Sequence, residues 1–97
     1  MSLLPLRFSG EERRFIVDNL ETDLVLTTAG LKLVDGYSKE DGFAVIGVSQ
    51  SEYEEFVADL REEYLWKATR ISNAACLVAL AKRFLPDFAS LEPMEFG

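Results

Sequence analysis

Residues 43–67 read FAVIGVSQSEYEEFVADLREEYLWK, and within them the pattern changes from that of a strand to that of a helix. The first six residues are apolar and rich in β-branched side chains, which favours a strand. Ser49 and Glu52, or alternatively Ser51 and Glu54, then have the spacing of a capping box, which opens a helix. The apolar residues that follow recur every three or four positions, as on one helix face: Tyr53, Phe56, Val57, Leu60 and Tyr64. Both patterns in one chain predict an α+β fold.

A second capping box lies near the start of the chain, where Ser9 is followed by Glu12. It predicts a helix over residues 10–20, with an apolar stripe on one side. Residues 3–8 offer a short strand that leads into this helix.

Residues 24–37 are ambiguous between strand and helix. The β-branched content of residues 24–28 favours a strand, and residues 31–37 fit a second one. The polar loop 38–42 ends in Asp-Gly, which is typical of a hairpin, so we expect the chain to turn there into the strand at 43–48. The alternative is a helix over residues 22–29 with Gly30 as its cap. We favour the strands.

The last predicted helix, residues 71–85, is apolar around most of its circumference and is stopped by Pro86. Such a helix is either central to the fold or half of a subunit interface. A small sheet would leave uncovered the side that carries Leu77, Leu80 and Phe84, so these are candidate residues for self-assembly, as in a homodimer. Cys76 is expected to be buried among its apolar neighbours.

A chain of 97 residues is long enough for one domain, which we take to be residues 1–97. We expect an α+β domain with an N-terminal helix, a small antiparallel β-meander of two or three strands, and two C-terminal helices packed on the sheet. The longest apolar run, residues 74–81, is too short to cross a bilayer, so no membrane association is expected.

The side chains of the common catalytic and metal sites are missing from the sequence. It has no histidine and one cysteine, which excludes a Ser-His-Asp triad and the usual zinc sites. It also has no glycine-rich phosphate loop and no dinucleotide fingerprint. We therefore expect no enzymatic activity and no cofactor. The single cysteine suits a reducing cytoplasm, where we expect the protein to be located.

The chain is acidic, with seventeen Asp and Glu against ten Lys and Arg and a net charge of −7. This balance repels nucleic-acid phosphates, so we expect no nucleic-acid partner. The charges are also segregated along the sequence. Residues 50–66 carry six acidic residues and one basic residue, whereas residues 67–83 carry four basic residues and no acidic one.

Within the acidic segment, Trp66 falls on the predicted water-facing side of its helix, among Glu55, Asp59 and Glu62. Tryptophan is a frequent hot-spot residue at protein interfaces, and acidic surroundings favour a basic partner. These four residues are therefore candidates for binding a protein partner. The alternative is that the helix bends near Trp66, or that residues 3–8 fold over it, and that Trp66 belongs to the core.

These observations predict a small acidic, non-catalytic module that binds a protein partner or assembles with itself. One alternative is a carboxylate-based enzyme or small-ligand binder with a pocket between the sheet and the helices. Another is a mimic of nucleic acid, which only the acidity supports.

Overall fold

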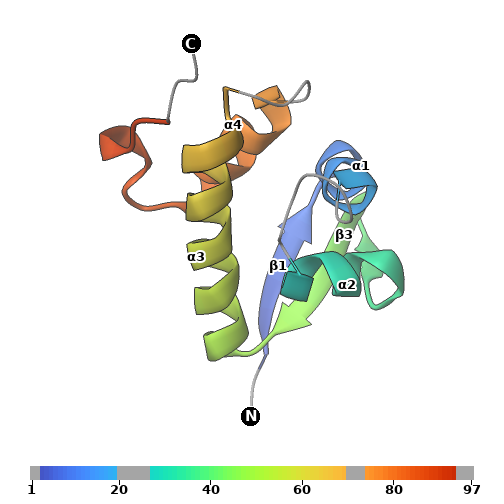
Figure 1. Ribbon diagram of the computed structural model, residues 1–97. Helices are drawn as coiled ribbons and strands as arrows, with labels where there is room; N and C mark the ends of the chain where they lie inside the picture. Colours follow the sequence, from blue (N-terminus) through green and yellow to red (C-terminus); the bar gives the residue numbers. More distant parts are fainter. Residues whose placement is uncertain (1–2, 20–26, 70–73, 94–97) are drawn as a thin grey trace.

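The computed structural model describes residues 3–19, 27–69 and 74–93 and has an α+β fold. Figure 1 shows the long helix α3 running alongside strands β1 and β3. Helix α1 contacts both of these strands, and α2 contacts β3. In chain order the elements are β1 (Leu4–Phe8), α1 (Gly10–Asn19), α2 (Thr27–Asp35), β2 (Ser38–Glu40), β3 (Phe43–Val48), α3 (Gln50–Lys67), α4 (Ala74–Phe84) and a short 3-10 helix η1 (Phe88–Ser90).

The three strands form one antiparallel sheet in the order β1-β3-β2. The strand offered by residues 3–8 is confirmed, and it precedes the N-terminal helix. Because β1 pairs with β3, two helices and a strand later, the sheet is not the consecutive meander that the sequence predicted. The pairing places Leu6 opposite Ile46 and Phe8 opposite Ala44, and all four side chains are buried.

The predicted strand at residues 31–37 is wrong, because most of that segment lies in α2. Gly30 and Leu33, three residues apart, are buried, whereas Leu31 and Val34 are exposed. That spacing is one turn of a helix rather than the alternation of a strand. Burial of one side of the segment outweighs its β propensity, which is sensitive to context.

The neighbouring predicted strand, residues 24–28, is also wrong where it is described. Its last two residues open α2, and residues 24–26 lie outside the described residues. The alternative, a helix over residues 22–29 capped by Gly30, is confirmed for residues 27–29 but wrong in its end, since α2 continues through Gly30 to Asp35. Lys32 Nζ, from the middle of α2, donates a hydrogen bond of 2.6 Å to the Gly47 carbonyl, and this bond ties the helix to β3.

The hairpin predicted to close at residues 38–42 is confirmed in its turn and in β3, but its first arm is short. Of residues 31–42, only Ser38–Glu40 pairs with β3. Asp41 has φ 52° and Gly42 has φ 84°, both in the left-handed region that a type I′ turn requires. The Asp-Gly pair therefore sets the point where the chain reverses.

Replacing Gly42 with alanine should lower the free energy of unfolding by about 1–2 kcal/mol, because a Cβ is disfavoured at this positive φ. Urea unfolding at neutral pH measures the change. Gly10→Ala is the matched control, since neither new Cβ would meet an atom within 4 Å and Gly10 has no left-handed φ. An equal loss in both variants would contradict the backbone explanation.

Both predicted capping boxes are present. In α1, the Ser9 hydroxyl accepts from the Glu12 N–H at 3.1 Å and the Glu12 carboxylate accepts from the Ser9 N–H at 2.8 Å. In α3, Ser49 and Glu52 form the same pair of bonds at 3.2 and 2.8 Å. Each box satisfies two backbone N–H groups that a helix start leaves unpaired, so α1 and α3 begin where the sequence predicted.

Three phenylalanine rings join the sheet to the last two helices at the centre of the core. Phe8 of β1 contacts Phe56 of α3, with ring centroids 6.0 Å apart, and Phe84 of α4, at 5.6 Å. Phe56 and Phe84 lie 5.1 Å apart and nearly perpendicular. Helix α4 therefore reaches the sheet through Phe84, while the rest of α4 packs on α1 and α3.

Helix α4 is central to the fold, which was one of the two interpretations of its apolar sequence. Leu77 and Leu80 have no exposed surface, and Phe84 is half-buried in the phenylalanine cluster. The prediction that this side is left uncovered for self-assembly is wrong, because α1 and α3 supply cover that the sheet alone could not. Cys76 is half-buried rather than buried.

Candidate functional site

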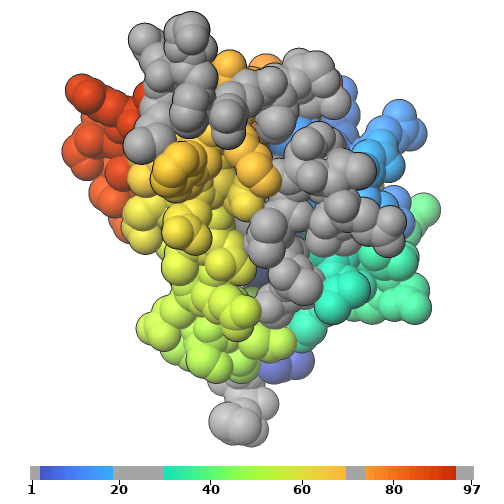
Figure 2. Space-filling model, in the orientation of Figure 1, coloured from blue at the N-terminus to red at the C-terminus, as the bar shows by residue number. Residues whose placement is uncertain are grey.

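Trp66 and three acidic side chains follow one face of α3. Glu55, Asp59, Glu62 and Trp66 are spaced four, three and four residues apart, so they line one side of the helix over about 17 Å. Trp66 is 48% exposed, Glu55 and Glu62 are exposed, and Asp59 is half-buried. We call these four residues the Trp66 stripe. Figure 2 shows α3, coloured yellow-green to yellow, forming part of the molecular surface.

The two basic residues of α3 are engaged by carboxylates outside the stripe. Arg61 donates to both oxygens of Asp87, from Nε at 3.1 Å and from a terminal nitrogen at 2.9 Å. Lys67 Nζ lies 2.8 Å from Oε2 of the buried Glu63, one helical turn earlier in α3. Among the described residues, no ion pair reaches an acidic member of the Trp66 stripe.

The stripe concentrates negative charge around Asp59. Partial burial raises the pKa of this carboxyl above its ordinary value of 3.8, and the charges of Glu55, Glu62 and Glu63 raise it further. Like charges this close disfavour one another's ionised forms. A cation placed beside Asp59 would relieve that repulsion, so the stripe is electrostatically suited to a positively charged ligand.

Acid should weaken the link between α3 and the segment after α4. The hydrogen bonds from Arg61 hold the pKa of Asp87 below its ordinary value of 3.8. A carboxyl whose pKa is lower in the folded state stabilises the fold at neutral pH, and this contribution is lost as pH falls through the folded value. We therefore expect Asp87→Asn to be less stable than the wild type at pH 7, with the gap closing below about pH 4.

Urea unfolding of both proteins across this pH range measures the gap. Glu92→Gln removes an exposed carboxylate that forms no ion pair with the described residues and serves as the control. A gap between wild type and Asp87→Asn that is constant from neutral to acid pH would contradict the assignment.

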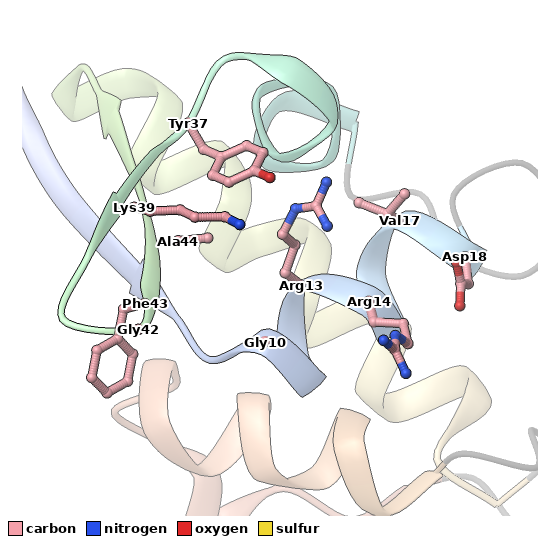
Figure 3. Close-up of a pocket in the computed structure, with 10 residues that line it drawn as sticks. All are labelled: Gly10, Arg13, Arg14, Val17, Asp18, Tyr37, Lys39, Gly42, Phe43 and Ala44. Carbon is pink, nitrogen blue, oxygen red and sulfur yellow. The ribbon is translucent and has the colours of Figure 1, made fainter.

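The structure reveals a second surface that the sequence analysis missed, a pocket between α1 and the β2–β3 hairpin. Its volume is about 420 Å³, and it is lined by three cations, Arg13, Arg14 and Lys39, and one carboxylate, Asp18. Figure 3 shows Lys39 extending from β2 toward Arg13 and Tyr37, while Arg14 points away from them. We call this the basic pocket.

No signal in the sequence brings these groups together, because Arg13 and Lys39 come from segments that are far apart along the chain. The only local indication is the Arg13-Arg14 pair in an otherwise acidic protein. One alternative drawn from the sequence was a carboxylate-based pocket between the sheet and the helices. The basic pocket contains Tyr37, but its charge is predominantly positive.

Metal and membrane features are absent from the described residues. These residues hold no group of three or more His, Cys, Asp or Glu side chains placed to bind a metal ion. No helix among them has the length and apolar character needed to cross a bilayer. No family model, curated protein or solved structure matches the chain.

Proposed function

We propose that the protein is a non-catalytic binding module that uses the Trp66 stripe to hold a basic segment of a protein partner. The observation that carries this proposal is the position of Trp66, which is 48% exposed at the end of a row of acidic side chains on one helix. Large aromatic side chains that stay partly in water are typical anchors of protein interfaces.

Charge complementarity argues for a basic partner. Glu55, Asp59 and Glu62 lie one turn apart, so lysine or arginine side chains spaced along an amphipathic helix or an extended segment can match them. Partial burial raises the pKa of Asp59 most, and the neighbouring carboxylates raise it further; such cations would relieve the repulsion among these carboxylates. The acidic row speeds and orients the encounter, while burial of the Trp66 ring supplies most of the affinity.

The open setting of these carboxylates argues against acid–base catalysis. Glu55 and Glu62 are exposed on the outer side of α3, and neither lines the basic pocket. A catalytic carboxylate pair needs an enclosed site that separates the pKa values of its two members. A binding face needs only exposure and a fixed spacing, which α3 provides.

The test uses Trp66, the only tryptophan in the chain, as the reporter. A synthetic amphipathic peptide of lysine and leucine is titrated against the protein while the tryptophan emission is followed. We expect a saturable one-to-one change with a shift of the emission to shorter wavelength as the ring is buried. The affinity should fall between about 50 and 500 mM salt, because exposed charges are screened.

Two charge-matched variants separate the stripe from the overall acidity of the protein. Glu55→Gln/Asp59→Asn/Glu62→Gln should bind the peptide at least tenfold more weakly. The control, which removes three exposed carboxylates elsewhere, should bind within twofold of the wild type: Asp35→Asn/Glu40→Gln/Glu92→Gln. Equal weakening in both variants, or unchanged binding when the peptide carries glutamate in place of lysine, would overturn the proposal.

A further inference from the structure

The basic pocket is separate from the Trp66 stripe, and its charge and size suit a different kind of ligand. Three cations and one carboxylate line a cavity of about 420 Å³ in a chain whose net charge is −7. Pockets of roughly 300–1,000 Å³ are the usual size for binding small organic molecules. The lining is thus mainly positive, whereas the protein as a whole is negative. The cavity is also larger than a single inorganic ion needs.

The cations of the basic pocket form no ion pair with the residues that the structure describes. Four ion pairs form within the described residues, and their cations lie elsewhere: Lys32, Arg61, Lys67 and Arg83. Arg13, Arg14 and Lys39 take part in none of them. Their positive charges are therefore not neutralised by an ion pair within the described residues.

The guanidinium of Arg13 is fixed in place before any ligand arrives. Its Nε donates a hydrogen bond of 3.0 Å to the Leu33 carbonyl of α2, and its central carbon lies 4.5 Å from the centroid of the Tyr37 ring. A guanidinium has five N–H groups, so the bond to Leu33 leaves the four on its terminal nitrogens. Because Arg13 is already ordered, a ligand that binds these groups loses less conformational entropy on binding.

We propose that the basic pocket binds the phosphate group of a small organic phosphomonoester. The paired terminal nitrogens of Arg13 suit two phosphate oxygens, and Lys39 adds a positive charge from the opposite wall. Three cations against one carboxylate match a doubly charged phosphate better than a singly charged carboxylate. The organic part of the ligand occupies the remaining volume, with Arg14 at the rim.

The test measures binding of ribose 5-phosphate and phenyl phosphate by isothermal titration calorimetry, with inorganic phosphate and ribose as comparisons. We expect at least one phosphomonoester to bind saturably and at least tenfold more tightly than inorganic phosphate, and ribose not to bind. The affinity should fall as pH drops below about 6, where the phosphate loses its second charge. If neither ester binds below 10 mM, or inorganic phosphate binds equally well, the proposal is overturned.

Charge-matched variants locate the site. Lys39→Gln should lower the affinity for the bound ester at least fivefold, and Arg14→Gln/Lys39→Gln should lower it further. Lys82→Gln removes an exposed lysine of α4, outside the basic pocket, and should bind within twofold of the wild type. If Lys82→Gln weakens binding as much as Lys39→Gln, the ester responds to overall charge and the proposal fails. Peptide binding by the Trp66 stripe should be unchanged in all three variants, whatever their affinity for the ester.

Discussion

Replacing Phe56 with alanine should lower the free energy of unfolding by about 3–5 kcal/mol, the largest loss we expect from one substitution. The Phe56 ring is 1% exposed and contacts Phe8 and Phe84, each at nearly a right angle. Alanine removes this buried surface and both edge-to-face contacts, and it leaves a cavity where β1, α3 and α4 meet. Small domains are stable by only about 5–15 kcal/mol, so such a loss brings the protein close to unfolding at moderate temperature.

Urea unfolding followed by circular dichroism measures this loss. Phe43→Ala is the matched control, because Phe43 is 39% exposed and lies outside the cluster of three rings. Its loss should be less than half that of Phe56→Ala. Equal losses in the two variants would mean that the phenylalanine cluster does not organise the core as described.

The elements that the sequence predicted well are those with local start signals. Ser9 with Glu12, and Ser49 with Glu52, specify two helix starts through bonds between residues only three positions apart. The Asp41-Gly42 turn is equally local, because it depends on two residues that tolerate a left-handed backbone. Each of these features forms from neighbouring residues, so the sequence contains most of the information that determines them.

The elements that the sequence missed depend on contacts between distant segments. Leu31 and Leu33 alternate as in a strand, yet α2 forms there because Leu33 is buried in the core and Lys32 bonds to β3. The pairing of β1 with β3 likewise joins the start of the chain to residues 43–48. Local propensity is a weak guide where long-range burial selects the structure.

The same distinction separates the two candidate sites. The Trp66 stripe lies on a single helix, so its spacing could be read from the sequence once the helix was predicted. The basic pocket assembles Arg13 from α1 with Lys39 from β2, and only the tertiary fold brings them together. For Leu77 and Leu80, the sequence predicted a surface left uncovered by the sheet, but both side chains are buried because other helices cover them.

Replacing Trp66 with alanine should separate stability from binding. The side chain is 48% exposed, so we expect a loss of about 1–2 kcal/mol in the free energy of unfolding, well below that of Phe56→Ala. Affinity for the lysine–leucine peptide should fall roughly 30-fold or more, the equivalent of about 2 kcal/mol for a hot-spot residue. Peptide binding by this variant is followed by calorimetry, because it lacks the fluorescent reporter.

Leu31→Ala is the control, since Leu31 is an exposed apolar side chain of α2 rather than of the Trp66 stripe, and its peptide affinity should not change. In the wild-type protein without peptide, acrylamide should quench the emission of Trp66, and bound peptide should protect it. Emission that resists quenching in the free protein, together with a stability loss of about 3–5 kcal/mol in Trp66→Ala, would place Trp66 in the core. The acidic row would then lack its anchor, because surface charge pairs alone contribute only about 0–1 kcal/mol each.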